Sequence, residues 1–497
     1  MDKQAQKEQE ITTVEHIPER DVEKSLSENK KNGDQSSPSE EELKLVRKLD
    51  LRILPIACLL YLFAYLDRSN LGNARLQGLT TDVLGGDPNG QLYGWLVSIF
   101  YFPYILLQVP ATLLMKLFSP RIWLGLSALG WGITSTLSSS AFNFPGIMVA
   151  RLFLGVFEAC FGPAIPLYLS FFYTKHEMGL RMAYWFGFAA VAGAFGGLIA
   201  FGVQHIHSSV SNWRLLFIIE GIPSVLLGIS ALIFLPDRPE MTKIFNEEER
   251  RIAIDRMNRS TSGDTGLTLT KRHIFMALRD WRIYTGGAIY FGANCALASI
   301  SAFLPTIITT FGYTNATAQL LTVPPYAVSA VVLILVSYVS DKRQTRGYFV
   351  AGANILAAVG YVILLAAVDN VHAKYFATFC ITSGTYTVIG LVIAWYSHNL
   401  GSETKRATGL PMFMGIGHCG SVLGSHIFPT SEEPRYIKGF SICCALLVLG
   451  VICSLVLYTS YRYDNHSRDK KYGKPEAGAK VDTSDLADKA PEFRYLP

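Results

Sequence analysis

The chain has 497 residues, of which 50% are hydrophobic and 17% are charged, and its formal net charge is +5. The charged fraction is below the ~25% of an average soluble domain. This composition excludes an ordinary soluble domain and indicates a helical protein that crosses a membrane many times. The net charge does not indicate nucleic-acid binding, because the basic residues concentrate in the tails and in the loops between apolar segments.

The chain begins with a polar segment, residues 1–44, that is rich in Ser, Glu and Lys. This composition is typical of a disordered tail. The segment has no apolar run of the kind that a cleavable signal peptide needs. We therefore expect residues 1–44 to form a disordered tail that is retained.

Twelve apolar segments of membrane-spanning length follow this tail. A helix needs about 20 residues to cross the hydrocarbon core of a bilayer. The segments are 52–75, 91–115, 122–141, 146–172, 182–205, 214–235, 283–308, 317–340, 347–368, 374–398, 408–428 and 438–461. They predict an all-α membrane protein with 12 transmembrane helices.

A long polar stretch divides these segments into two groups of six. We predict an N-terminal six-helix half at 45–235, a linker at 236–282, a C-terminal six-helix half at 283–461 and a tail at 462–497. The linker is expected to include a short amphipathic surface helix. Pseudo-symmetric halves of this kind hold a substrate site between them, near the midplane of the membrane.

Loop charge predicts the orientation of the chain in the membrane. The loops on one side contain Lys116 and Arg121, the basic stretch 236–282, and Lys405 with Arg406, whereas most loops on the other side carry almost no charge. Basic loops face the cytoplasm in membrane proteins. Both termini are therefore predicted to be cytoplasmic.

Charged residues also lie inside two of the apolar segments. Asp67 and Arg68 are adjacent in LFAYLDRSNLGNA, and Arg151 and Glu158 lie seven residues apart in RLFLGVFEACFGPA. A spacing of seven places Arg151 and Glu158 on one face of a helix. Charges at these depths cost roughly 2.5–3.5 kcal/mol each at a helix centre, and they usually mark functional sites.

Helix geometry predicts how these charges meet. From the predicted helix ends, Asp67 lies ~22 Å into the membrane from the cytoplasm and Arg151 ~8 Å from the opposite boundary. In a core about 30 Å thick, the two are at a similar height and can form an ion pair. Arg68 points about 100° away from Asp67 and can face a cavity.

These charges suit a proton-coupled carrier of organic anions. An arginine keeps a nearby carboxylate ionised, and an anion that competes for the arginine favours protonation of the acid. The planar guanidinium binds both oxygens of a carboxylate. The alternative is an ion-pair cluster that only fixes the packing of the helices.

Several stretches resemble those of the major facilitator superfamily. They are YLDRSNLGNA at 65–74, RLFLGVFEACFGPA at 151–164, NWRLLFIIEGIPS at 212–224, AQLLTVPPY at 318–326, KRATG at 405–409, PRYIKG at 434–439 and PEFRY at 491–495. Over roughly residues 45–465, the chain is similar to the anion:cation symporter family and to its fungal allantoate, nicotinate and pantothenate permease branch.

The resemblance implies roles for six of the residues. Asp67 and Glu158 would take the protons, and Arg68 and Arg151 would organise the substrate and proton sites. The aromatic positions that line the cavity of such symporters correspond to Tyr65 and Tyr104 in this chain.

Three further polar residues lie inside apolar segments. Asn294 either supplies an amide to the cavity or bonds a neighbouring helix. His418 either contacts substrate and titrates near neutral pH or is a hydrogen-bonded structural histidine. Glu220, in IIEGI, is expected to have a structural or gating role rather than to bind protons.

We therefore interpret the chain as a proton-coupled secondary transporter that imports a small organic anion such as nicotinate, pantothenate or allantoate. We expect it to act as a monomer in the plasma membrane, with no nucleic-acid partner, no cofactor and no enzymatic activity. All eight cysteines lie in apolar segments, so no disulfide framework or metal site is expected. The alternatives are a nutrient receptor with the carrier fold, and a carrier of another small solute in the endoplasmic reticulum or vacuolar membrane.

Overall fold

The structure is a computed structural model that describes residues 39–260, 270–367, 370–433, 435–475 and 481–497. Residues 48–497 form one compact unit, and the contacts described below lie within it. Most of the predicted disordered tail falls outside the described residues. The first described helix begins at Glu40, within the last residues of that predicted tail.

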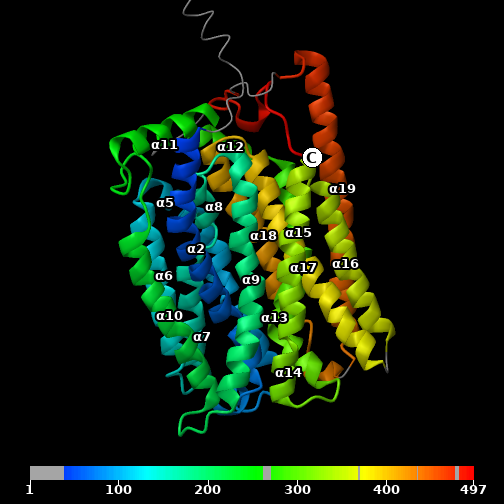
Figure 1. The fold of residues 1–497 in the computed structure, drawn as a ribbon. Helices are drawn as coiled ribbons and strands as arrows, with labels where there is room; N and C mark the ends of the chain where they lie inside the picture. Colours follow the sequence, from blue (N-terminus) through cyan, green and yellow to red (C-terminus); the bar gives the residue numbers. More distant parts are fainter. Residues whose placement is uncertain (1–38, 261–269, 368–369, 434, 476–480) are drawn as a thin grey trace, which may run out of the picture. The chain divides into compact units, whose positions relative to one another are not determined.

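The described secondary structure is helical, and it accounts for all twelve predicted segments (Figure 1). The helices that match these segments are α2 (Glu40–Arg75), α4 (Gln91–Ser98) with α5 (Tyr101–Leu117), α6 (Pro120–Ser138), α7 (Phe144–Ala159) with α8 (Ala164–Leu169), α9 (Lys175–Gln204), α10 (Asn212–Phe234), α13 (Trp281–Thr309), α14 (Asn315–Leu321) with α15 (Val323–Arg343), α16 (Gly347–Ala366), α17 (Val371–Asn399), α18 (Glu403–Gly424) and α19 (Ile437–Tyr472). The all-α prediction is confirmed.

Ten helical stretches among the described residues are long and apolar enough to cross a membrane. The other two predicted segments, 122–141 and 408–428, correspond to α6 and α18. These helices are less apolar because α6 contains many Ser, Thr and Gly residues and α18 begins with the charged sequence ETKR.

Shorter elements connect the long helices. They are α3 (Leu79–Val83), α11 (Glu247–Ser260), α12 (Lys271–Leu278) and two 3-10 turns at Thr430–Glu432 and Ala487–Lys489. The helices α11 and α12 lie in the predicted linker, where a short surface helix was expected.

Three of the spanning stretches are interrupted at places that the sequence explains. The break between α7 and α8 contains Gly162 and Pro163, and α15 begins with Pro324 and Pro325 directly after the end of α14. Proline has no backbone N–H and clashes with the preceding turn of a helix. The third break, at residues 99–100, precedes Pro103 by one turn.

The two predicted halves contact each other along two lines of helix packing. The helix α5 packs against α18, and α9 packs against α15 and α14. Within the halves, α10 runs along α6, α13 runs along α18, and α16 runs between α17 and α19 (Figure 1). The exact domain boundaries remain predictions.

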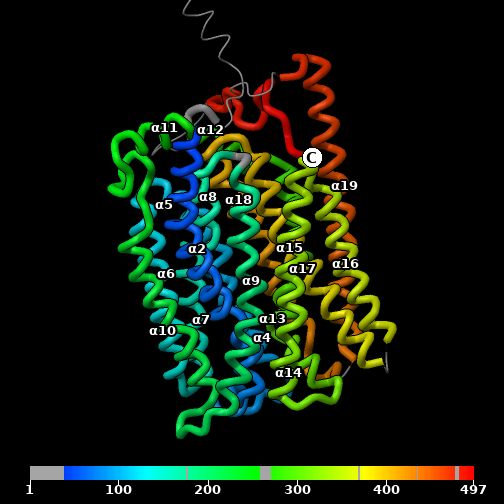
Figure 2. The backbone as a smooth tube through the Cα atoms, viewed as in Figure 1, coloured from blue at the N-terminus to red at the C-terminus, as the bar shows by residue number. Residues whose placement is uncertain are grey.

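The final segment of the chain, residues 481–497, is bound to the ends of the C-terminal helices. In Figure 2 this red segment lies at the same end of the helices as α11 and α12. The buried Lys405 Nζ donates to Asp280 and to Asp488, both at 2.6 Å. Asp488 also accepts from the Tyr495 hydroxyl at 2.9 Å. The segment thus supplies one of the two carboxylates that neutralise Lys405.

Main-chain groups near residue 497 continue this attachment. The Leu496 carbonyl accepts from Trp395 Nε1 at 2.8 Å and from the Asn399 side-chain amide at 2.9 Å. The Leu496 N–H donates to the Asn399 side-chain oxygen at 2.8 Å. The Arg346 N–H donates to the Pro497 oxygen at 2.6 Å. The predicted tail therefore includes an ordered segment that ties α16, α17 and α18 together.

Replacement of Asp488 by Asn should destabilise this region. Loss of one partner from a buried ion pair costs about 3 kcal/mol, so the apparent melting temperature of the purified protein should fall by several degrees. The control is Asp485→Asn, because the ion pair of Asp485 with Arg272 is largely exposed and such pairs contribute roughly 0–1 kcal/mol. Equal melting temperatures for the two variants would contradict this role of Asp488.

Candidate functional site

The four predicted intramembrane charges lie together where α2 meets α7. The guanidinium of Arg151 donates to two main-chain carbonyl oxygens of α2, that of Asp67 at 2.8 Å and that of Arg68 at 3.1 Å. Arg151 is buried, with 1% of its surface exposed. It therefore fixes the position of the one turn of α2 that carries the adjacent charges.

The predicted ion pair between the side chains of Asp67 and Arg151 is not formed. The carboxylate of Asp67 instead accepts hydrogen bonds from the hydroxyls of Ser135, on α6, and Ser224, on α10, the latter at 2.7 Å. The physical reason is direction: the Arg151 guanidinium approaches α2 at its backbone, whereas the Asp67 side chain points away toward α6 and α10.

Arg68 pairs with Glu158. Its Nη2 lies 2.5 Å and its Nε 3.2 Å from the same oxygen of Glu158. The other carboxylate oxygen of Glu158 has no hydrogen-bond partner among the described residues. The guanidinium also lies over the rings of Phe100, at 4.9 Å, and Tyr104, at 5.1 Å. The prediction that Asp67 and Arg68 serve different partners agrees with this geometry.

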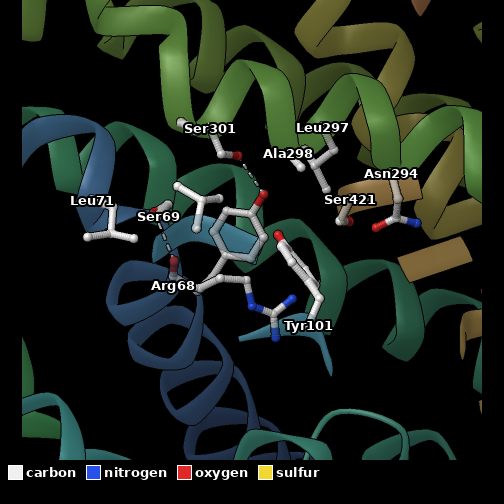
Figure 3. A pocket seen from close by; sticks show the side chains of 12 residues that line it. Arg68, Ser69, Leu71, Tyr101, Asn294, Leu297, Ala298, Ser301 and Ser421 are labelled. Carbon is white, nitrogen blue, oxygen red and sulfur yellow. Dashed lines mark hydrogen bonds between the residues drawn. The ribbon is translucent and has the colours of Figure 1, made fainter. Parts of the chain in front are cut away.

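A small cavity lies beside Arg68 (Figure 3). Its wall includes Arg68 and Tyr65 from α2, Tyr101 from α5, Asn294 and Ser301 from α13, together with Ser421 from α18. The cavity has a volume of about 30 Å³, whereas sites for organic ligands typically have about 300–1,000 Å³. Helices from both halves must therefore separate before an organic molecule can enter.

The cavity is closed on one side by close contact between α2 and α13. A Cβ atom on Gly72 would lie 2.7 Å from the Ser301 carbonyl oxygen and 3.0 Å from that of Ala302. The Ala302 carbonyl also accepts from the Tyr93 hydroxyl at 3.2 Å. Only glycine at position 72 permits this approach.

Hydrogen bonds between aromatic residues join the two halves beside the cavity. The Tyr386 hydroxyl, from α17, donates to the Tyr65 hydroxyl at 2.8 Å, and Tyr65 lies 3.3 Å from the Ser301 hydroxyl. At the predicted cytoplasmic ends of the helices, Lys116 Nζ, from α5, donates to Thr404 at 3.1 Å and lies 3.6 Å from Glu403. The halves are thus in contact beside the cavity and at the predicted cytoplasmic ends of the helices.

The other predicted site residues lie at or next to this cavity. Asn294 lines it, and its amide donates to the Tyr290 carbonyl of its own helix at 2.9 Å rather than to a neighbouring helix. The ring of His418 lies between Tyr101 and Tyr104, at centroid distances of 5.8 and 4.7 Å. Neither ring nitrogen of His418 has a hydrogen-bond partner in the described part of the chain. A hydrogen-bonded structural histidine is therefore not what this geometry shows.

Several residues of this site were not predicted from the sequence. Ser135 and Ser224 hold Asp67, and Tyr101, Ser301 and Ser421 line the cavity. Serines are common in membrane helices, where most of them bond their own backbone. One available signal was the position of Ser224, one helical turn after the buried acid Glu220.

Gly155, on the Arg151 face of α7, permits close helix packing. A Cβ atom there would lie 2.2 Å from the Phe100 carbonyl oxygen, between α4 and α5. Phe100 in turn lies beside Arg68, with 4.9 Å between the ring centroid and the guanidinium carbon.

Comparison with known proteins identifies similar chains. Residues 57–425 match the family model described as Major Facilitator Superfamily. The chain is 36% identical over 468 residues to "Major facilitator-type transporter hxnP" of Emericella nidulans, covering 92% of this chain and 94% of that one. It is 31% identical over 464 residues to "High-affinity nicotinic acid transporter" of Saccharomyces cerevisiae, covering 92% and 85%.

The fold is also similar to solved structures. One is the proton:xylose symporter XylE bound to 6-bromo-6-deoxy-D-glucose, with a TM-score of 0.67 and 15% identity, covering 89% of this chain and 99% of that one. Another is XylE from E. coli in a partially occluded inward-open conformation, with a TM-score of 0.64. These matches confirm the predicted major facilitator fold, and the relatives are transporters rather than enzymes.

Replacement of Gly72 by Ala should disrupt the contact between α2 and α13. The added methyl group overlaps main-chain atoms, which cannot move as a side chain can, and overpacking of this kind costs about 1–3 kcal/mol. The melting temperature of the purified protein should fall. Gly352→Ala is the control, because no atom lies within 4 Å of its added Cβ. A Gly72→Ala protein as stable as this control would contradict the proposed close contact.

Proposed function

Because the chain belongs to the major facilitator superfamily, we propose that it is a proton-coupled secondary transporter that imports a small organic anion by alternating access. The observation that carries this proposal is the ion pair between Arg68 and Glu158 at the wall of the closed cavity. The arginine is the anion-binding group, and the carboxylate next to it is the proton-binding group.

Competition between two anions for one arginine would couple the fluxes. A substrate carboxylate that binds Arg68 displaces Glu158 from the guanidinium. An unpaired carboxylate in a dry site is strongly disfavoured, so Glu158 takes a proton as the substrate binds. The halves can then rock around a neutralised site. Release of the substrate on the other side restores the ion pair and frees the proton.

A planar monocarboxylate suits the cavity wall. Arg68 provides the fork that binds carboxylate oxygens, and the rings of Tyr65 and Tyr101 and the amide of Asn294 surround the adjacent space. The similarity to a high-affinity nicotinic acid transporter supports nicotinate or a related carboxylate. We further propose membership of the anion:cation symporter family and its fungal allantoate, nicotinate and pantothenate permease branch.

The remaining assignments follow from the same proposal. Asp67 belongs to the proton-coupling group, Arg151 positions α2 beside the substrate, and Tyr104 and His418 pack behind Arg68. The transporter acts as a monomer in the plasma membrane with both termini in the cytoplasm. A receptor with this fold would signal without accumulating radiolabelled substrate in the cell. A carrier of an internal membrane would be recovered in the cell fraction that contains that membrane.

Glu158→Gln should abolish concentrative uptake. Glutamine cannot take up a proton, so a pH gradient no longer drives accumulation, and the accumulation ratio of radiolabelled nicotinate should fall to about one. Exchange of internal for external substrate should persist, because Arg68 is still present. Pantothenate and allantoate are tested in parallel.

The control for this experiment is Glu249→Gln, which removes an acid that pairs with Lys48 outside the membrane helices. It should accumulate substrate like the natural protein. Acid-stimulated accumulation by Glu158→Gln at the natural level would show that Glu158 does not couple the proton.

Arg68→Lys should weaken the binding of carboxylate substrates. Lysine keeps the charge but loses the planar fork, and a bidentate contact of this kind is not replaced by an ammonium group. We expect the KM for uptake to rise by roughly tenfold or more, in line with the strength of charge-assisted hydrogen bonds. Arg52→Lys is the control on the same helix, because Arg52 is exposed and its guanidinium lies 5.8 Å from the ring of Phe234, far from the cavity wall. An unchanged KM for every transported carboxylate would remove Arg68 from the binding site.

A further inference from the structure

Arg75, the last residue of α2, is a half-buried cation that the proposed transport mechanism does not yet use. Its guanidinium lies over two aromatic rings, 4.7 Å from the ring centroid of Tyr93, on α4, and 5.6 Å from that of Phe303, on α13. Within the described part of the chain, its side chain forms no ion pair and donates no hydrogen bond. A cation–π contact uses none of the N–H donors of a guanidinium, so these donors remain available for an anion.

The acidic residues at this end of the helices have other partners. This end lies opposite the predicted cytoplasmic ends, and its connections contain four described acids. Their partners are the Trp213 indole for Asp82, at 2.8 Å, the Tyr93 N–H for Asp87, at 2.8 Å, Lys438 Nζ for Glu432, at 3.1 Å, and the Tyr436 hydroxyl for Glu433, at 2.7 Å. None of these four described carboxylates lies within ion-pair distance of Arg75.

Arg75 shares a face of α2 with Arg68. A spacing of seven residues places the two positions within about 20° of each other around the helix and about 10 Å apart along it. Arg68 lies over Phe100 at 4.9 Å, and Arg75 lies over Tyr93 at 4.7 Å. These two rings are also seven residues apart, in the opposite direction along the chain. The arginine–aromatic arrangement beside the cavity is therefore repeated two helical turns further out.

The close contact between α2 and α13 lies between the two arginines. Gly72 is four residues after Arg68 and three before Arg75, so all three lie on one face of α2. The Ala302 carbonyl that Gly72 approaches also accepts from the hydroxyl of Tyr93, the ring beside Arg75. The contact thus separates Arg68, on the cavity side, from Arg75, on the outer side. When α2 and α13 move apart, one path leads from Arg75 to Arg68.

We propose that Arg75 is an outer binding site that captures the carboxylate group of the substrate before the substrate reaches Arg68. The inference rests on the proposed function and adds a first site to the entry path. A cation at the mouth of such a path attracts anions and can speed their association by about tenfold or more. The guanidinium binds the carboxylate oxygens, and the rings of Tyr93 and Phe303 offer apolar surface to the rest of a planar molecule.

The test is the initial rate of radiolabelled nicotinate uptake by cells at external concentrations below KM. Arg75→Gln removes the charge, so this rate should fall about tenfold. Raising the ionic strength of the external medium screens the attraction. It should therefore slow uptake by the natural protein and slow uptake by Arg75→Gln much less.

The control is Lys438→Gln, which removes a positive charge at the same end of the helices. Lys438 is largely exposed and pairs with Glu432, so this variant should transport like the natural protein at every ionic strength. An unchanged rate in Arg75→Gln, or an equal loss in the two variants, would overturn the proposal.

A change of charge at one position distinguishes capture of an anion from simple packing. Arg75→Cys is treated from outside with membrane-impermeant methanethiosulfonates that attach either a trimethylammonium or a sulfonate group of similar length. The positive adduct should restore uptake, and the negative adduct should lower it further. The natural protein, treated in the same way, reports any effect through its own eight cysteines. Equal effects of the two adducts would overturn the proposal, and this variant also serves if Arg75→Gln is not produced in folded form.

Failure of the proposed function is recognised separately. If Glu158→Gln still accumulates nicotinate under a pH gradient, coupling through that acid is wrong, whereas opposite responses to the two adducts still assign capture to Arg75. If Glu158→Gln loses accumulation and the two adducts act alike, only the outer site is wrong.

Discussion

The geometry of this site depends on the hydrogen bonds from Arg151 to the main chain of α2. A guanidinium that bonds the carbonyl oxygens of Asp67 and Arg68 holds their backbone without forming an ion pair with the Asp67 carboxylate. The adjacent residues are then free to point in different directions. Arg68 reaches Glu158 and the cavity, whereas Asp67 reaches Ser135 and α10. A buried cation at this position separates two side chains that are neighbours in the sequence, one of which lines the cavity while the other bonds serines of α6 and α10.

The sequence predicted the elements that depend on short-range patterns. Apolar runs located all twelve spanning helices, and a spacing of seven residues placed Arg151 and Glu158 on one face of α7. Depth along the helices correctly brought Asp67 and Arg151 to the same level. The same estimate could not tell whether Arg151 meets the carboxylate or the backbone of Asp67. Which of the two groups Arg151 meets depends on the rotation of α2 and α7 about their own axes. The residue pattern of the sequence does not specify this rotation.

Contacts between distant helices were the least predictable part of the site. Ser135 carries no sequence feature that separates it from serines bonded to their own helix, and the one signal for Ser224 was its position one turn after Glu220. The surroundings of His418 include Tyr290 from α13 of the same half and Tyr101 from α5, which reaches it only when the halves meet.

The attachment of residues 481–497 has a consequence for how the protein is made. These residues are translated after every spanning helix, yet Lys405, Asn399 and Trp395 use them as hydrogen-bond partners. Insertion of the helices into the membrane therefore cannot complete the C-terminal half. The hydrogen-bond partners that residues 481–497 supply to these helix ends are available only once that segment has docked, whereas Lys405 already has a second partner in Asp280.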